Sequence, residues 1–170
     1  RQGIADCIAL MTEKPPRGSA KSFGLKALQH WADMLAKSTK ESWSVAYLTG
    51  RPLLSALTSA YTFLGTAFGK THQSDRDTYA DFLDEASQIL GKPELENVAV
   101  RYRMAGKAWD GLQCALLPET VSILKEAKLA IDMKTELLLE KGSSATDAML
   151  EQTQALEALM KQAETDFGMS

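Results

Sequence analysis

Apolar residues recur at intervals of three and four along almost the whole chain, and prolines and glycines separate the repeating segments. This spacing places apolar side chains on one face of an α-helix, whereas a half-buried strand needs alternation with a period of two. No stretch of useful length alternates in that way. The sequence therefore predicts an all-α protein, a single-domain bundle of six or seven helices.

Prolines and glycines also set the expected helix boundaries. Pro15 and Pro16 end a first helix near the N-terminus, because proline removes a helix hydrogen bond and clashes with the preceding turn. After the second helix we expect a loop with one short helical turn, anchored by Trp43 and Tyr47. The helices beyond the first are expected at residues 24–37, from Pro52 to near Gly69, from after Ser74 to Gly91, at 93–117, at 119–141 and from Ser144 onward.

The length of 170 residues suits one domain. We predict that this helical domain covers residues 1–142, with 143–170 as a C-terminal helix that packs on the bundle or forms a tail. The chain begins with Arg1 rather than methionine, and from this we infer a piece of a longer protein.

The composition is that of an ordinary globular protein, with 45% hydrophobic and 24% charged residues. The net charge of -3 provides no broad attraction to nucleic acid or to an acidic membrane surface. No run of 18 or more apolar residues occurs, so we expect no membrane-spanning helix. We therefore predict partners other than nucleic acid and membranes.

Two cysteines and two histidines are the residues that could supply thiol or imidazole chemistry. Cys7 and Cys114 lie far apart without a CxxC motif, so we predict free thiols in a cytoplasmic protein, each buried as a small apolar side chain. No pair among these cysteines, His30 and His72 has the short spacing of a zinc site. GxSxG, HExxH and Walker motifs are absent from the sequence. We predict no metal site, no cofactor and no self-contained active site.

The segment GTAFGKTHQSD, residues 65–75, has the composition of a phosphate-binding loop. A P-loop requires GxxxxGK followed by Ser or Thr, placed after a strand. Here the motif is one residue short and follows a predicted helix, so we do not predict nucleotide binding. His72, within this segment, is kept as a candidate binding residue.

Arg76 lies at the edge of the apolar arc of its helix, one turn before Tyr79. Two interpretations stay open: the guanidinium forms an internal salt bridge, or it reaches a carboxylate of a ligand or partner domain. The aromatic residues also have two interpretations, because rings at helical spacing either fill a core or line a pocket. The arcs expected to face inward are Tyr79, Phe82, Leu83, Ala86, Ile89 and Leu90 in one helix, and Leu95, Val98, Ala99, Tyr102, Ala105 and Trp109 in the next.

The order of several motifs is similar to that of a known family. The first helix closes on EKPP, and SFGLKALQHWADML forms the second. TGRPLLSALTSAYTFL follows a tryptophan-containing loop, and YADFLDEA comes after Arg76. With Tyr102, Arg103 and Trp109, this order resembles the helical domain of unknown function that follows the papain-like N-terminal domain of butirosin-biosynthesis-protein-H-type proteins. The resemblance covers nearly the whole chain and is weakest after Gly142.

This resemblance implies an accessory role. In such proteins the N-terminal domain resembles a cysteine peptidase or acyltransferase, and the namesake activity transfers an acyl group from an acyl carrier protein to an amine of an aminoglycoside. The catalytic domain would precede Arg1, and an exposed apolar strip is expected on the first helix. The implied partners are that domain, an acyl carrier protein, a small amine acceptor or a second copy of the chain. The candidate ligand- or partner-binding residues are Arg76, Tyr79, His72, Trp43, Tyr102, Arg103 and Trp109.

A stand-alone binding module is the alternative. Asp81, Asp84 and Glu85 share the outer side of one helix, and with the aromatic residues they would suit a small cationic or amphiphilic ligand. A solvated helix face is the ordinary explanation of such carboxylates. A dimerisation domain is a further alternative.

Overall fold

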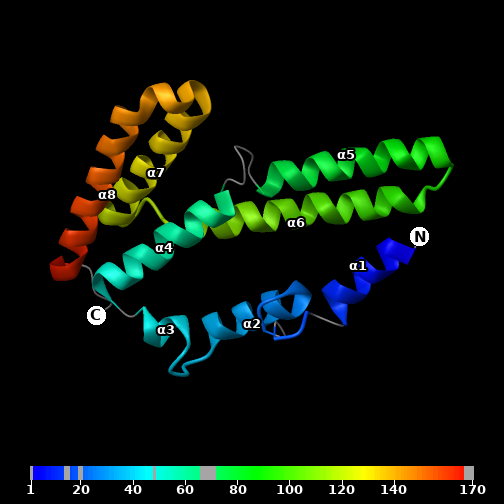
Figure 1. Cartoon of the computed structure of the whole chain (residues 1–170), viewed down its shortest axis with the longest axis horizontal. Coiled ribbons are helices and arrows are strands. Elements are labelled where there is room, and N and C mark those ends of the chain that lie inside the picture. Colours follow the sequence, from blue (N-terminus) through cyan, green and yellow to red (C-terminus); the bar gives the residue numbers. More distant parts are fainter. Residues whose placement is uncertain (1, 14–15, 19–20, 48, 66–71, 167–170) are drawn as a thin grey trace. The chain divides into compact units, whose positions relative to one another are not determined.

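The computed structural model describes residues 2–13, 16–18, 21–47, 49–65 and 72–166, with the backbone alone for 72–74, 165 and 166. Within these residues it contains eight α-helices, seven of them longer than one turn, and no strand, which confirms the all-α bundle. The helices are α1 (Gln2–Thr12), α2 (Gly24–Ala36), α3 (Trp43–Ala46), α4 (Gly50–Gly65), α5 (His72–Leu90), α6 (Glu94–Leu116), α7 (Ser122–Lys141) and α8 (Thr146–Asp166), with a 3-10 turn η1 (Gly142–Ala145) before α8 (Figure 1).

Most expected boundaries lie within a few residues of the observed ones, and the later start of α7 has a visible cause. Helix α7 begins at Ser122 rather than at 119, because the residues after Pro118 first form a turn in which the Val121 amide donates to the Pro118 carbonyl. Helix α4 is described as far as Gly65, and its expected end near Gly69 lies outside the described residues. Residues 66–71, which include most of the GTAFGKTHQSD segment, lie outside the described residues.

The chain divides into two compact units, residues 1–48 and 49–170. In the first unit α1 contacts α2, and α2 contacts α3. Gly24 opens α2 with a positive φ of 66°, and a Cβ there would collide with the carbonyl oxygen of Met11. Glycine therefore permits the close approach of α2 to the end of α1. Ile4, Ile8 and Met11 form the exposed apolar strip that was expected on the first helix.

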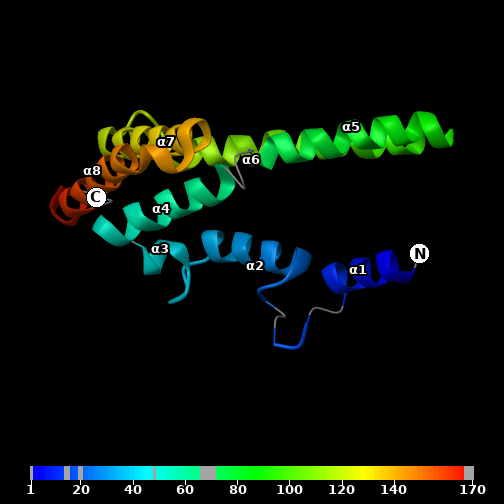
Figure 2. The same cartoon turned by 45° about the horizontal axis from the view of Figure 1, so that its top comes forward.

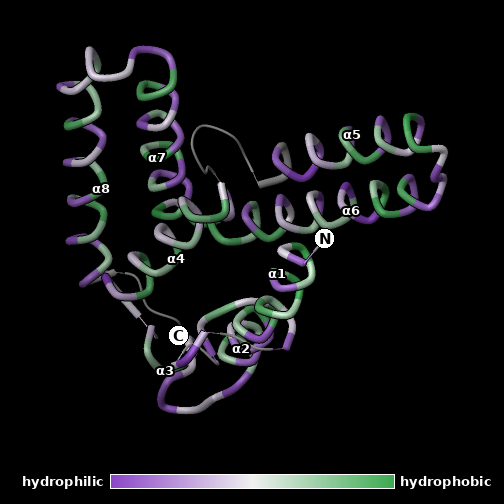
Figure 3. The backbone as a smooth tube through the Cα atoms, turned by 45° about the vertical axis from the view of Figure 1, so that its right-hand side comes forward, coloured by the Kyte–Doolittle hydropathy of each residue, from purple (hydrophilic) through white to green (hydrophobic). Residues whose placement is uncertain are grey.

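The second unit consists of two antiparallel helix pairs, α5 with α6 and α7 with α8, and of α4, which contacts α6, α7 and α8 (Figures 1 and 2). Hydrophobic and hydrophilic stretches follow one another within each of these helices (Figure 3). The predicted boundary at residue 142 falls inside this unit, between α7 and η1, and α8 packs on α4 and α7.

The larger core lies where α4 meets α7 and α8. Its buried residues are Leu54 and Tyr61 of α4, Leu117, Ile123, Leu124, Ala127 and Ile131 in and before α7, and Leu159 and Ala163 of α8. Leu54 is wholly buried, and burying a leucine side chain contributes roughly 1.5–3 kcal/mol. Gly50, with a φ of 62°, allows close contact with α8, since a Cβ there would lie 3.1 Å from the Ala163 carbonyl oxygen.

Tyr61 is the core residue with a polar group to satisfy. Its hydroxyl donates to Oδ1 of Asp132 on α7 at 2.7 Å. Burial, and then the hydrogen bond to the neighbouring carboxylate, raise the pKa of the Tyr61 phenol well above its usual range. The phenol therefore stays protonated and links α4 to α7.

We expect Leu54→Ala to lower the free energy of unfolding by about 2–5 kcal/mol, because it leaves a cavity where α4 meets α7 and α8. Urea denaturation followed by circular dichroism measures the change. Leu150→Ala is the control, since this leucine is exposed. A loss for Leu54→Ala no larger than that of the control would contradict the position of α4 in the core.

We expect Tyr61→Phe to cost about 1 kcal/mol at pH 7 through the lost hydrogen bond. Because the pKa of the Tyr61 phenol is raised, the stability depends on pH. The contribution of the phenol to the free energy of unfolding is complete below the unfolded tyrosine pKa of about 10, and it is lost as the pH rises from there toward the higher pKa of the folded state. Unfolding curves at pH 7 and pH 11 measure this, and the difference between wild type and variant should shrink at the higher pH. A difference that grows with pH would show that Tyr61 does not stay protonated in the folded state.

Candidate functional site

Five of the predicted binding residues come together on the α5–α6 hairpin. Arg76 and Tyr79 lie on α5, and Tyr102, Arg103 and Trp109 lie on α6. The other two are not part of this group. Trp43 belongs to the first unit, and the side chain of His72 lies outside the described residues.

The sequence of the α5–α6 connection brings the two helices side by side. Gly91 follows α5 with a φ of 62°, the left-handed conformation that commonly ends a helix. The buried Ser87 hydroxyl donates to the Lys92 carbonyl at 2.9 Å, and the Lys92 amide donates to the Ser87 carbonyl at 3.0 Å. Pro93 then precedes α6, so the chain reverses within a few residues.

Small side chains allow α5 and α6 to pack closely. Ala80 and Ala99 are completely buried and form a compact cluster with Leu83, against which Leu95 packs. Gly106 is also buried in α6. The buried strip between the helices is therefore narrow, and larger side chains beside it lie on its two flanks.

One flank carries a charged cluster around Arg103. A single guanidinium nitrogen of Arg103 lies 2.5 Å from Oδ1 of Asp81 and 2.8 Å from Oδ2 of Asp84. These hydrogen bonds, that with Asp81 first, raise the pKa of the Arg103 guanidinium. Arg103 therefore connects the two helices and is already engaged, which argues against a direct role in holding a ligand carboxylate.

The other flank carries the aromatic residues. The rings of Tyr79 and Tyr102 have centroids 4.7 Å apart across the hairpin, and Phe82 lies 5.7 Å from Tyr79 along α5. The guanidinium of Arg76 stands over the Trp109 ring, 5.1 Å from its centroid. We call these five residues the aromatic face.

The aromatic face is largely exposed, which corrects the expected inward arcs. Tyr79, Phe82 and Tyr102 are all exposed, with Phe82 at 56%, and the exposed Ile89 and Val98 have the helical spacing that extends the same flank. The arcs were predicted to be core because they are apolar. Helices α5 and α6 bury only a narrow strip against each other, so much of each arc remains exposed.

Phe82 was not among the predicted binding residues. A partial signal for it exists in the sequence, because the apolar arc of α5 includes Phe82 and spans about a third of the helix circumference. Only the structure shows that the buried strip against α6 is narrower than this arc. The partners of Arg103 had a signal too, since Asp81 and Asp84 are spaced by three on one side of α5.

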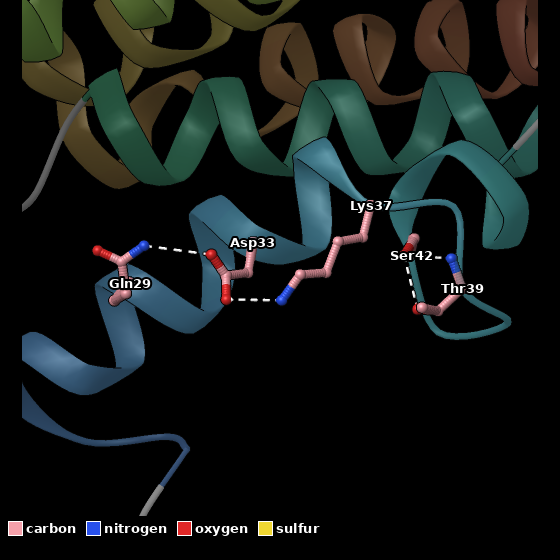
Figure 4. A network of polar contacts seen from close by, with 5 residues as sticks. All are labelled: Gln29, Asp33, Lys37, Thr39 and Ser42. Carbon is pink, nitrogen blue, oxygen red and sulfur yellow. Dashed lines mark hydrogen bonds and ion pairs between the residues drawn. The ribbon is translucent and has the colours of Figure 1, made fainter.

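Trp43 has a local role in the first unit. Its ring makes edge contacts with Trp31 at 6.3 Å and with Tyr47 at 5.4 Å between centroids. The preceding Ser42 is completely buried, and its hydroxyl accepts a hydrogen bond from the Thr39 amide at 2.9 Å (Figure 4). Trp43 therefore anchors α3 near the end of α2, as expected of an anchor residue.

The same figure shows a polar row along α2. Lys37 donates to Asp33 at 2.8 Å and Gln29 donates to the other oxygen of this carboxylate at 3.2 Å (Figure 4). These bonds, that from Lys37 first, lower the pKa of Asp33. The row lies on one exposed helix face and stabilises α2 locally.

The cysteines are not placed as expected. Cys7 and Cys114 are both exposed and neither forms a disulfide, so the prediction of buried thiols is wrong. Cys114 lies on α6 and Cys7 on α1. In the described part of the chain, no group of three His, Cys, Asp or Glu side chains could hold a metal ion. None of the helices described there combines the length and the apolar character needed to cross a membrane.

Comparisons of the chain with protein-family models, with curated proteins and with solved structures found no match. The resemblance to the helical domain of butirosin-biosynthesis-protein-H-type proteins therefore stays a prediction.

We expect Arg103→Met to lower the melting temperature, because it removes the connection between α6 and two carboxylates of α5. The loss should shrink in about 1 M salt, where charges are screened over roughly 3 Å. Arg101→Met is the matched control, because Arg101 is an exposed arginine on the same helix. Equal losses for the two variants, measured by differential scanning calorimetry, would show that the charged cluster does not hold the hairpin together.

Proposed function

We propose that this chain is an accessory helical domain that binds a protein partner through the aromatic face of the α5–α6 hairpin. The observation that carries the proposal is the exposure of this face. Contiguous exposed apolar surface commonly marks an interaction site. Tyrosine, tryptophan and arginine are also the residue types most enriched among those that dominate binding energy.

The geometry of the face favours binding in a second way. The Tyr79 ring contacts the rings of Tyr102 and Phe82, and the Arg76 guanidinium stands over the Trp109 ring. Side chains already fixed by their neighbours lose less conformational entropy when a partner covers them. On the opposite flank, the ion pairs of Arg103 with Asp81 and Asp84 join α6 to α5. The aromatic face therefore lies on two helices that are fixed to each other.

The class of partner is proposed from the motif order alone. Its similarity to butirosin-biosynthesis-protein-H-type proteins favours a papain-like domain with acyltransferase or cysteine-peptidase chemistry as the partner. In that arrangement the chain supports the catalytic domain and helps to shape the site for an acyl carrier protein or a small amine acceptor.

A module for a small cationic ligand is less favoured. Its proposed site relied on Asp81, Asp84 and Glu85, and the first two already form ion pairs with Arg103. A cation would have to displace a guanidinium from these carboxylates.

The proposal is tested by mixing the chain with a separately produced papain-like domain of a butirosin-biosynthesis-protein-H-type protein. We expect saturable binding by calorimetry and no transfer of an acyl group from a carrier protein to an amine by the chain alone. Phe82→Asp should weaken binding about tenfold or more, because it places a charge in a desolvated contact.

Val100→Asp is the control, because Val100 is 54% exposed, close to the 56% of Phe82, and lies on a different side of α6 from Tyr102. Clear turnover by the isolated chain would rule out the accessory role. Equal loss of affinity in both variants would rule out the aromatic face as the contact surface.

A further inference from the structure

A second surface, separate from the aromatic face, lies on the α7–α8 pair. An open groove of about 460 Å³ runs between these helices, lined by Leu129 and Met133 of α7 and by Ala155, Ala158 and Leu159 of α8. Leu159 is buried and belongs to the core, so the groove is closed beneath by the packed interior of the unit. Leu129 and Met133 are exposed beside it.

The groove forms where small side chains lie next to larger ones. Ala130, Ala155 and Ala158 contribute a single methyl group each, which leaves space above the contact between the two helices. Leu129 and Met133 then form an apolar wall on the α7 side. A row of small residues beside an apolar wall lets the side chains of a third helix enter between two packed helices.

The rim of the groove is acidic. Glu126 lines it directly. On α7, Glu136 and Glu140 continue the helical row of Leu129 and Met133, and on α8 Glu151 precedes Ala155 by one turn. All four glutamates are exposed. Lys125, in the same row of α7, and Lys161, which follows Ala158 by one turn on α8, contribute two opposing charges, so the rim remains negative.

We propose that this groove binds an amphipathic helix of a basic partner protein. The apolar stripe of such a helix would lie over the alanines, against Leu129 and Met133, in the manner of helix-in-groove recognition. Its lysines and arginines would flank the stripe and face the four glutamates. The site does not depend on the aromatic face, and the two surfaces can be tested separately.

The rim also argues against a second copy of the chain as the occupant. In a two-fold symmetric contact the same patch meets itself, so this acidic rim would be placed against an identical acidic rim. Like charges facing each other across an interface oppose association. A basic helix avoids this repulsion and satisfies both the apolar floor and the charged edges.

The experiment uses a fluorescent 18-residue peptide made of leucine and lysine, with the leucines at helical spacing, and measures anisotropy as the whole chain is added. A scrambled peptide of the same composition tests whether helical alignment matters. We expect saturable binding of the aligned peptide and binding about tenfold weaker for the scrambled one. Equal binding of the two peptides, or no saturable binding below about 1 mM, would overturn the proposal.

Paired variants locate the site. Leu129→Gln should weaken binding about tenfold, whereas Leu150→Gln should leave it unchanged. These leucines are 55% and 53% exposed, so neither change should unfold the chain, and circular dichroism checks this. Equal effects of the two variants would overturn the proposal.

The role of the charged rim is tested with variants of exposed glutamates, which leave the apolar packing of the groove unchanged. The double variant Glu136→Gln with Glu151→Gln should weaken the peptide complex and reduce its dependence on salt, whereas Glu85→Gln on α5 should do neither. An unchanged affinity and salt dependence in the double variant would overturn the role of the rim. Analytical ultracentrifugation that showed a dimer, lost in Leu129→Gln, would assign the groove to a second copy instead.

Discussion

Helix α4 holds the second unit together, because it contacts α6, α7 and α8. Its buried side supplies Leu54 and Tyr61 to the larger core, and the Tyr61 hydroxyl is satisfied by Asp132 of α7. The close contact of α4 with α8 favours glycine at position 50, where φ is positive and a Cβ would lie 3.1 Å from the Ala163 carbonyl oxygen. On the α6 side, Gly65 lies against the end of the Gln113 side chain. Both candidate surfaces are therefore carried by helix pairs that pack on one common helix.

In each helix pair some apolar side chains stay exposed beside the buried contact. These exposed side chains form the aromatic face on α5–α6 and the groove on α7–α8. Between α5 and α6 the buried strip is built from Ala80, Leu83 and Ala99, and the aromatic residues lie beside it. Between α7 and α8 the alanines leave a groove, and Leu129 and Met133 stand at its edge. Burial of apolar area is the main favourable term in association, so these uncovered areas are where a partner gains most free energy.

The helices were predictable because their signals are local. Periodic apolar residues, prolines and capping glycines lie within a few positions of the elements they define, as Gly91 and Pro93 show between α5 and α6. The aromatic pairs were only partly predictable. Tyr79 and Tyr102 were singled out separately, but the contact between their rings depends on how α5 and α6 pack. The burial expected for Phe82 and for the two cysteines was wrong, because periodicity says which face is apolar and not how much of it a neighbour covers.

The sequence by itself determined the all-α class, the approximate bounds of the helices and the apolar face of each one, since these follow from local spacing and backbone preference. Only the tertiary structure decided which part of each face is buried. It paired Arg103 with Asp81 and Asp84, placed Arg76 over Trp109, and packed Trp43 within the first compact unit. The physical reason is that these contacts join residues distant in sequence, and their geometry depends on helix packing that no local pattern encodes.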